Sequence, residues 1–151
     1  MQHMGKICFL FGHRDAAESI LALLEEAIEA HCRDYGVGTF VVGHYGGFDR
    51  LARVALLRVK KRYPEIRLYM LIPYHPADRP IETPEGFDGT YYPPLESVPK
   101  RYAIVRANQY MVRQTDYVIC YVQHFGNTRL LLELAEKRGI AICNLAEAPG
   151  G

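Results

Sequence analysis

The chain has 151 residues, of which 49% are hydrophobic and 23% charged, and its formal net charge is +1 at pH 7. This length suits one domain with a single hydrophobic core that needs no metal or disulfide to stabilise it. The near-neutral charge argues against a nonspecific nucleic-acid binder, because such proteins are usually strongly basic.

The cysteines indicate a reducing compartment. They show no CxxC spacing, and three of the four lie inside apolar patterns: Cys8, Cys32, Cys120 and Cys143. We therefore expect reduced thiols that serve as small core residues in a cytoplasmic protein, rather than a zinc site. No apolar run approaches the roughly 20 residues of a membrane span, and Met1 to Gly5 has no apolar signal core, so no membrane partner is expected.

Short apolar runs alternate with helical periodicity along the chain. The runs predict strands over residues 7–11, 39–42, 67–72, 117–122 and 140–143. The helical patterns predict helices over about 16–31, 51–62, 99–114 and 130–137. Asp15 followed by Glu18 predicts a capped start for the first helix, and Gly139 predicts the C-cap of the last one.

The segment 73–98 has a different character from the rest of the chain. Seven of the nine prolines lie between Pro73 and Pro99, mixed with glycines and aromatic residues. A long stretch without regular structure inside a compact domain usually forms a functional lid or is disordered. The aromatic content favours an ordered lid.

The alternation of strands and helices predicts the fold. Hydrophobic strands joined by helices form a parallel sheet covered on both faces, so residues 1–151 are expected to form a single α/β domain, a Rossmann-like three-layer sandwich. The expected five-stranded order is 3-2-1-4-5. Because this order reverses between the first and fourth strands, a ligand crevice is expected between their carboxyl ends.

The predicted strand exits share a pattern of glycine or proline and histidine. They read Gly12-His13, Gly43-His44, Pro73-Tyr74-His75 and Gln123-His124. Backbone N–H groups and glycines at helix N-termini, together with the charge of Arg14, would form a phosphate cradle. The strongest part of this cradle is the loop Gly43-His44-Tyr45-Gly46-Gly47. Asp49 is expected either to bind a ribose hydroxyl or to cap the second helix.

Two other interpretations of these polar residues stay open. The histidines, with Asp15 and Asp49, are of the right type to bind a metal, but neighbouring strands lie about 4.8 Å apart, so four strand ends span too far for one ion. Two or three ligands could still converge, although no tightly bound metal is expected. Individual histidines, in particular His31 and His75, are expected to cap helices or bind loop backbone.

The two later helices add further candidates. Arg106 and Asn108 are two residues apart on the third helix and cannot face the same way, and we favour Asn108 for the crevice while keeping Arg106. Gly126, Asn127 and Thr128 open the fourth helix, where Thr128 is expected either to cap the helix or to donate to a phosphate.

Several of these stretches resemble a known family. The segments Phe11-Gly12-His13-Arg14-Asp15, Val42 to Leu51, Tyr63-Pro64-Glu65-Ile66-Arg67 and Asn108-Gln109-Tyr110-Met111 resemble bacterial proteins of the SLOG superfamily. That group embraces DUF1273/YpsA-like proteins, LOG phosphoribohydrolases and the DNA-processing protein DprA. The resemblance implies a Rossmann-like fold with a site for nucleotides or their derivatives at the strand ends. The catalytic glutamate of the LOG signature corresponds to Leu131 here.

The leading functional hypothesis is a protein that binds or senses a nucleotide or nucleotide-like phosphate compound, held between the exits of the first, second and fourth strands and covered by the lid. The alternative is a nucleotide hydrolase that cleaves an N-glycosidic or phosphate bond, with His13, Asp15 or Asp49 as acid or base. A second alternative is DprA-like binding of single-stranded DNA, against which the charge argues. The cofactor identity is open, and a homo-oligomer is compatible with the sequence.

Overall fold

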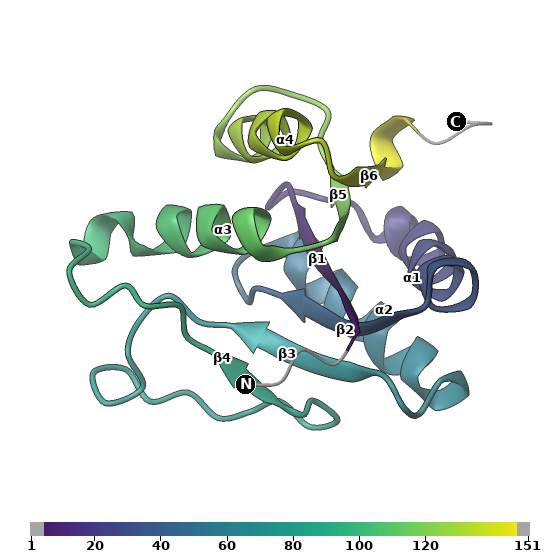
Figure 1. Ribbon diagram of the computed structural model, residues 1–151, viewed down its shortest axis with the longest axis horizontal. Helices are drawn as coiled ribbons and strands as arrows, with labels where there is room; N and C mark the ends of the chain where they lie inside the picture. Colours follow the sequence, from purple (N-terminus) through teal and green to yellow (C-terminus); the bar gives the residue numbers. More distant parts are fainter. Residues whose placement is uncertain (1–4, 148–151) are drawn as a thin grey trace.

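The computed structural model describes residues 5–147, which form one six-stranded parallel sheet flanked by helices (Figure 1). Neighbouring strands follow the order β4-β3-β2-β1-β5-β6. The strands are β1 (Lys6–Gly12), β2 (Val37–Val42), β3 (Arg67–Leu71), β4 (Gly89–Tyr91), β5 (Tyr117–Tyr121) and β6 (Ala141–Asn144). The α-helices are α1 (Leu21–Tyr35), α2 (Gly47–Arg62), α3 (Ala103–Gln114) and α4 (Asn127–Arg138). Short 3₁₀ turns cover Glu18–Ile20, Lys100–Tyr102 and Leu145–Glu147.

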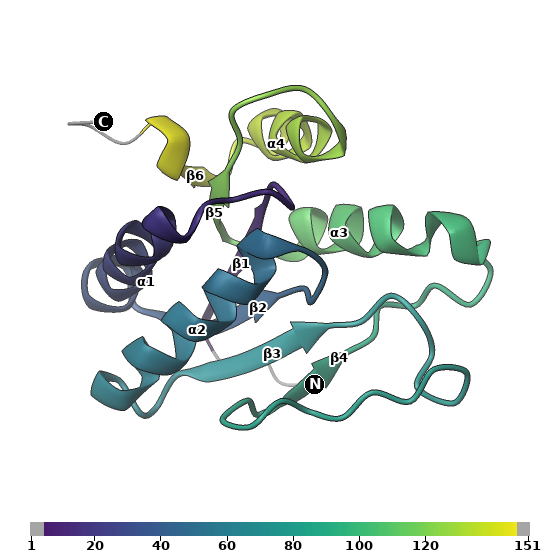
Figure 2. The ribbon, with the colours of Figure 1, turned by 180° about the vertical axis from the view of Figure 1, so that it is seen from behind.

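Two hydrophobic clusters lie on opposite faces of the sheet, because successive strand side chains alternate between its faces. Cys8 and Leu10 of β1 pack with α1 and α2, whereas Phe9 and Phe11 pack with α3 and α4. Figures 1 and 2, seen from opposite sides, show the same two layers of helices. The predicted three-layer α/β sandwich is therefore confirmed.

The predicted strand order is also confirmed, with one strand more than expected. The five predicted strands correspond to β3-β2-β1-β5-β6, in the expected sequence of neighbours. The additional strand, β4, lies at the sheet edge beside β3 and belongs to the 73–98 segment. Its Gly-Thr-Tyr sequence contains no apolar run, which explains why the hydrophobic pattern did not reveal it.

Backbone pairing around Asp88 holds β4 against β3. The Asp88 N–H donates to the Leu68 carbonyl at 2.8 Å, and the Asp88 carboxylate accepts the Leu68 N–H at 2.8 Å. Lys60 of α2 lies 3.1 Å from the same carboxylate. The segment is thus ordered in part by the sheet itself.

The helix boundaries differ from the prediction at the start of α1. The chain first forms the 3₁₀ turn Glu18–Ile20, and Ala17 precedes it without any side-chain cap. Asp15 is exposed rather than a cap, and Glu18 pairs with Arg50 of α2. The predicted capping box is therefore wrong. The expected C-cap at Gly139 is confirmed by its φ of 73°.

The other starts shift by a few residues. Pro99 precedes the 3₁₀ turn Lys100–Tyr102, so α3 begins at Ala103. The helix α4 begins at Asn127, three residues before the predicted start, because the chain turns directly at Gly126. Within residues 5–147, no helix combines the length and apolar character that crossing a membrane requires.

The topology creates a switch point between β1 and β5. These strands are neighbours in register from Cys8 opposite Tyr117 to Gly12 opposite Tyr121. The chain leaves β1 toward α1 on one face and leaves β5 toward α4 on the other. Connections that diverge in this way open a crevice at the carboxyl edge of a parallel sheet.

Candidate functional site

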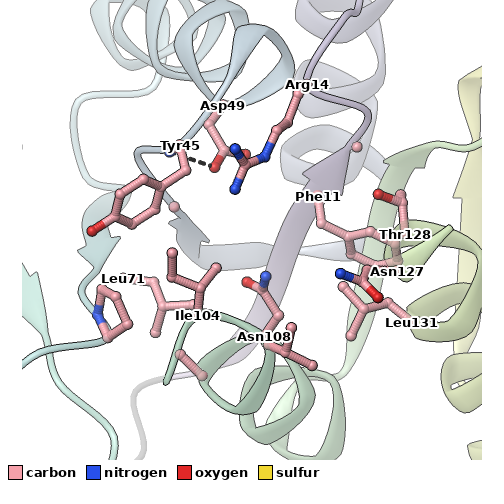
Figure 3. Close-up of a pocket in the computed structure, with 15 residues that line it drawn as sticks. Phe11, Arg14, Tyr45, Asp49, Leu71, Ile104, Asn108, Asn127, Thr128 and Leu131 are labelled. Atoms are coloured by element: carbon pink, nitrogen blue, oxygen red, sulfur yellow. Dashed lines mark hydrogen bonds between the residues drawn. The ribbon is translucent and has the colours of Figure 1, made fainter. Parts of the chain in front are cut away.

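A pocket lies at this carboxyl edge, and it contains about 690 Å³ of space, part of it open to solvent. Five regions of the chain meet there. They are the ends of β1 and β3, the loop from β2 into α2, and the first two turns of α3 and of α4 (Figure 3). The lining residues are Phe11, Gly12, Arg14, Gly43, Tyr45, Asp49, Leu71, Pro73, Ile104, Val105, Ala107, Asn108, Asn127, Thr128 and Leu131.

Polar side chains face the pocket with unused hydrogen-bonding capacity. Figure 3 shows Arg14 on one side and Asn108 and Asn127 on the opposite side. Within residues 5–147, the side chains of Arg14, Asn108, Asn127 and Thr128 make no hydrogen bond or ion pair. One guanidinium, two amides and a hydroxyl are thus available to a ligand.

Asp49 is the acidic group of the pocket. Its carboxylate accepts the N–H of Tyr45 at 3.0 Å. Burial raises the pKa of Asp49 to about 7, against the lowering effects of the Tyr45 N–H and of the cations Arg53 and Arg14. Gly43 leaves room for this arrangement, because a Cβ there would lie 2.7 Å from the Asp49 oxygen. Asp49 lies in the first turn of α2 rather than at its N-cap, which is Gly46.

The N-terminus of α2 is closed by the turn that follows β1. The Gly47 N–H donates to the Arg14 carbonyl at 2.7 Å, and the Phe48 N–H donates to the His13 carbonyl at 3.3 Å. Gly46 has a φ of 95°, and a Cβ there would lie 2.9 Å from Arg14 Cα. These two glycines allow one loop to pack on another, so α2 offers no free N–H cluster to a phosphate.

The N-terminus of α4 is open by contrast. The N-cap residue Gly126 provides no side-chain cap, and the first helical bond runs from the Leu130 N–H to the Gly126 carbonyl at 3.3 Å. In the described part of the chain, no acceptor meets the N–H groups of Asn127, Thr128 and Arg129. An α-helix N-terminus with free donors favours an anion.

His13 has a structural position beneath this turn. Its side chain is 4% exposed, and its Nε2 accepts the N–H of Gln123 at 2.8 Å and that of His124 at 3.3 Å. An Nε2 that accepts carries no proton, and burial together with His124 lowers the pKa of His13. His13 therefore joins the end of β1 to the turn before α4 and does not line the pocket.

His13, Asp15 and His124 bring possible metal-binding atoms within 4.8 Å of one another. The two imidazole rings are stacked, with centroids 3.7 Å apart and planes inclined by 6°. A metal binds an imidazole nitrogen in the plane of the ring, and one ion cannot lie in two parallel planes. The His13 Nε2 lone pair is also already used, so we assign no metal to this cluster.

The remaining candidates lie around the pocket rather than in it. Arg106 is exposed and does not line the pocket, whereas Asn108 does, as their helical spacing predicts. His44 packs edge-on against Tyr45 with ring centroids 4.3 Å apart, and burial lowers its pKa. Gly126 also lies outside the lining.

The expected local roles of two other histidines are confirmed. The His31 Nδ1 lies 2.7 Å from the Ala27 carbonyl, and the His75 Nδ1 accepts the Ala77 N–H at 3.0 Å. The sequence does not reveal the apolar part of the pocket, which includes Phe11, Leu71 and Ile104. Their pattern is that of core residues, and no signal distinguishes a core residue from one at the base of a pocket.

The fold and the pocket define a class of protein, the Rossmann-like α/β domains with a ligand crevice at the carboxyl edge of a parallel sheet. Two solved structures of the molybdenum cofactor carrier protein from Chlamydomonas reinhardtii are similar, with TM-scores of 0.61 and 0.59. Each is 15% identical, and each match covers 97% of this chain and 79% of the other. Likeness at this identity shows a shared fold. No protein-family model and no curated protein sequence matches the chain.

Proposed function

We propose that the chain binds a phosphorylated small molecule, a nucleotide or nucleotide derivative, in the pocket formed by the ends of β1 and β3, the loop from β2 into α2, and the starts of α3 and α4. One observation carries this proposal. The Arg14 guanidinium, which makes no hydrogen bond or ion pair in the described part of the chain, and the open N-terminus of α4 line the same pocket. A phosphate between them would receive the Asn127 and Thr128 N–H groups, the Thr128 hydroxyl and the Arg14 fork. Asp49 would accept a hydroxyl of the attached sugar.

Two likenesses support a small-molecule ligand. The SLOG-type motifs imply a nucleotide site at the strand ends, and the structural neighbours are carriers of the molybdenum cofactor. A protein that carries a small molecule must also bind it, so a carrier function for this chain is compatible with the proposed binding. The molybdenum cofactor therefore belongs among the ligands to be tested. We propose the 73–98 segment as the mobile part of the site, of which Pro73 already lines the pocket.

Calorimetric titration with ATP, NAD, ADP-ribose and nucleoside monophosphates tests the proposal. Arg14→Ala should weaken binding at least about tenfold, because a charged hydrogen bond to phosphate is lost. Arg106→Ala is the matched control, since it removes one exposed arginine outside the pocket. Absence of binding at millimolar concentration, or equal weakening by both substitutions, would overturn the proposal.

One observation favours hydrolysis as a second candidate function. Asp49 lines the pocket with a pKa raised to about 7 by burial, which suits a general acid or base at neutral pH. Of the other predicted acid–base residues, His13 has its Nε2 occupied and Asp15 is exposed outside the pocket. Chromatography of nucleoside monophosphates incubated with the protein would detect free base or nucleoside. Loss of product formation in Asp49→Asn would support this function, and unchanged turnover would exclude Asp49 as the base.

A further inference from the structure

A second pocket lies on the other side of Pro73. Pro73 is buried and lines both pockets, and Ala103 of the second pocket directly precedes Ile104 of the first. The second pocket consists of residues from 73 to 103 and therefore belongs to the segment around β4. The two cavities thus share one proline ring and the start of α3.

The walls of the second pocket are aromatic and apolar. Tyr74 and Tyr92 line it together with the buried side chain of Leu95. His75 meets the Tyr92 ring edge-on with centroids 5.3 Å apart, and the Ala77 N–H fixes the His75 ring at Nδ1. Aromatic rings beside an apolar floor favour a planar ring system as ligand.

Three charged side chains complete this pocket. Asp78, Glu96 and Lys100 line it, and within residues 5–147 their side chains have no hydrogen bond or ion pair. The two carboxylates accept N–H groups, and the ammonium donates to a carbonyl oxygen. This combination is complementary to a ring edge that presents N–H donors next to a carbonyl, as the Watson–Crick edge of guanine does.

We propose that the second pocket binds the heterocyclic ring of the ligand whose phosphate lies in the first, and that it selects a guanine-type edge. The carboxylate of Glu96 accepts the ring N–H and amino group, Lys100 donates to the ring carbonyl, and Tyr92 packs against the ring. The inference rests on the proposed function of the first pocket. It gives the 73–98 segment the role of selecting the ligand.

Calorimetric titration of the whole chain with four probes separates the two pockets. Inorganic phosphate and ribose 5-phosphate report on the first pocket, whereas AMP and GMP also reach the second. We expect AMP to bind about tenfold more tightly than ribose 5-phosphate because of stacking, and GMP about tenfold more tightly than AMP because of its matched edge. Arg14→Ala should weaken all four.

Variants of the second pocket should affect the nucleotides alone. Glu96→Gln should bring the affinity for GMP to that for AMP, and Tyr92→Leu should weaken both nucleotides, with phosphate and ribose 5-phosphate unchanged. Glu85→Gln is the matched control, because Glu85 is exposed on the same segment and lines neither pocket. Glu96 is exposed, so its substitution leaves the core intact even where Tyr92→Leu weakens it.

The failures of the two proposals are distinguishable. If none of the four probes binds, and ATP, NAD and ADP-ribose do not bind either, the proposed function itself is wrong. If all four bind within about threefold of one another, or if Glu96→Gln leaves the preference for GMP over AMP unchanged, the first pocket stands and the second-pocket inference is overturned.

Discussion

Replacing Asp49 with asparagine should remove the part of the protein's stability that is lost as the pH rises from about 4 to about 7. Burial raises the pKa of this carboxyl from its ordinary 3.8 to about 7. The native state then holds a proton that the unfolded chain has released, so the contribution of Asp49 to stability falls as the pH rises from about 4 to about 7. The full difference corresponds to at most about 4 kcal/mol, an upper limit because the side chain is half-buried.

The asparagine variant keeps an oxygen that can accept the Tyr45 N–H but does not titrate. We expect the stability of the variant relative to the parent to increase by up to about 2.5 kcal/mol between pH 5 and pH 8. The measurement is urea unfolding of both proteins across this range. Because burial lowers the pKa values of His13, His31 and His44 in both proteins, their opposite effects on stability cancel in the difference. A difference that stays constant with pH would show that Asp49 titrates at its ordinary value and refute the reasoning.

Three further predictions concern the framework of the site. Gly12→Ala should destabilise the fold by about 1–3 kcal/mol, measured by urea unfolding, because the added Cβ would lie 2.4 Å from the buried Phe48 ring. Gly89→Ala is the control and should change the stability little, since its added Cβ would lie 3.5 Å from the Tyr69 ring. His13→Phe should lower the stability by about 1–3 kcal/mol, since the N–H groups of Gln123 and His124 lose their acceptor. The control is His124→Ala, which replaces an exposed side chain. Equal effects of the two substitutions would argue against His13 as the acceptor that holds this turn. Asp88→Ala should speed cleavage after the exposed Glu85 by a glutamate-specific protease, because β4 loses its side-chain bonds to Leu68 and Lys60. An unchanged rate would mean that backbone pairing alone holds the segment.

The regular elements of this protein follow from local sequence. Apolar runs such as the one before Gly12 bury both faces of a strand, and the strict alternation with helices leaves few parallel topologies. The strand order and the sheet edge that carries the pocket could therefore be predicted. The strand β4 could not, because its pairing depends on Asp88 and Leu68, which are 20 residues apart in the chain.

The candidate site was only partly predictable for the same reason. Arg14 and Thr128 could be predicted to line the pocket because polar residues there follow a strand or open a helix, and Asn108 because it cannot face the same way as Arg106. The role of the glycine loop could not be predicted. Gly46 and Gly47 would be needed in the sequence whether a phosphate or another loop packs against them. The structure shows that the backbone of Arg14 fills that place.

What the sequence alone determined is the five apolar strands and the four helices, the order of those strands in the sheet, and the edge at which polar residues gather. Only the tertiary structure decided which helix N-terminus is open, that His13 binds backbone rather than ligand, and that the burial of Asp49 shifts its pKa. These properties depend on distances between segments as far apart as His13 and Gln123. Hydrogen bonding and desolvation act over a few ångströms in space, and no local pattern in the sequence records them.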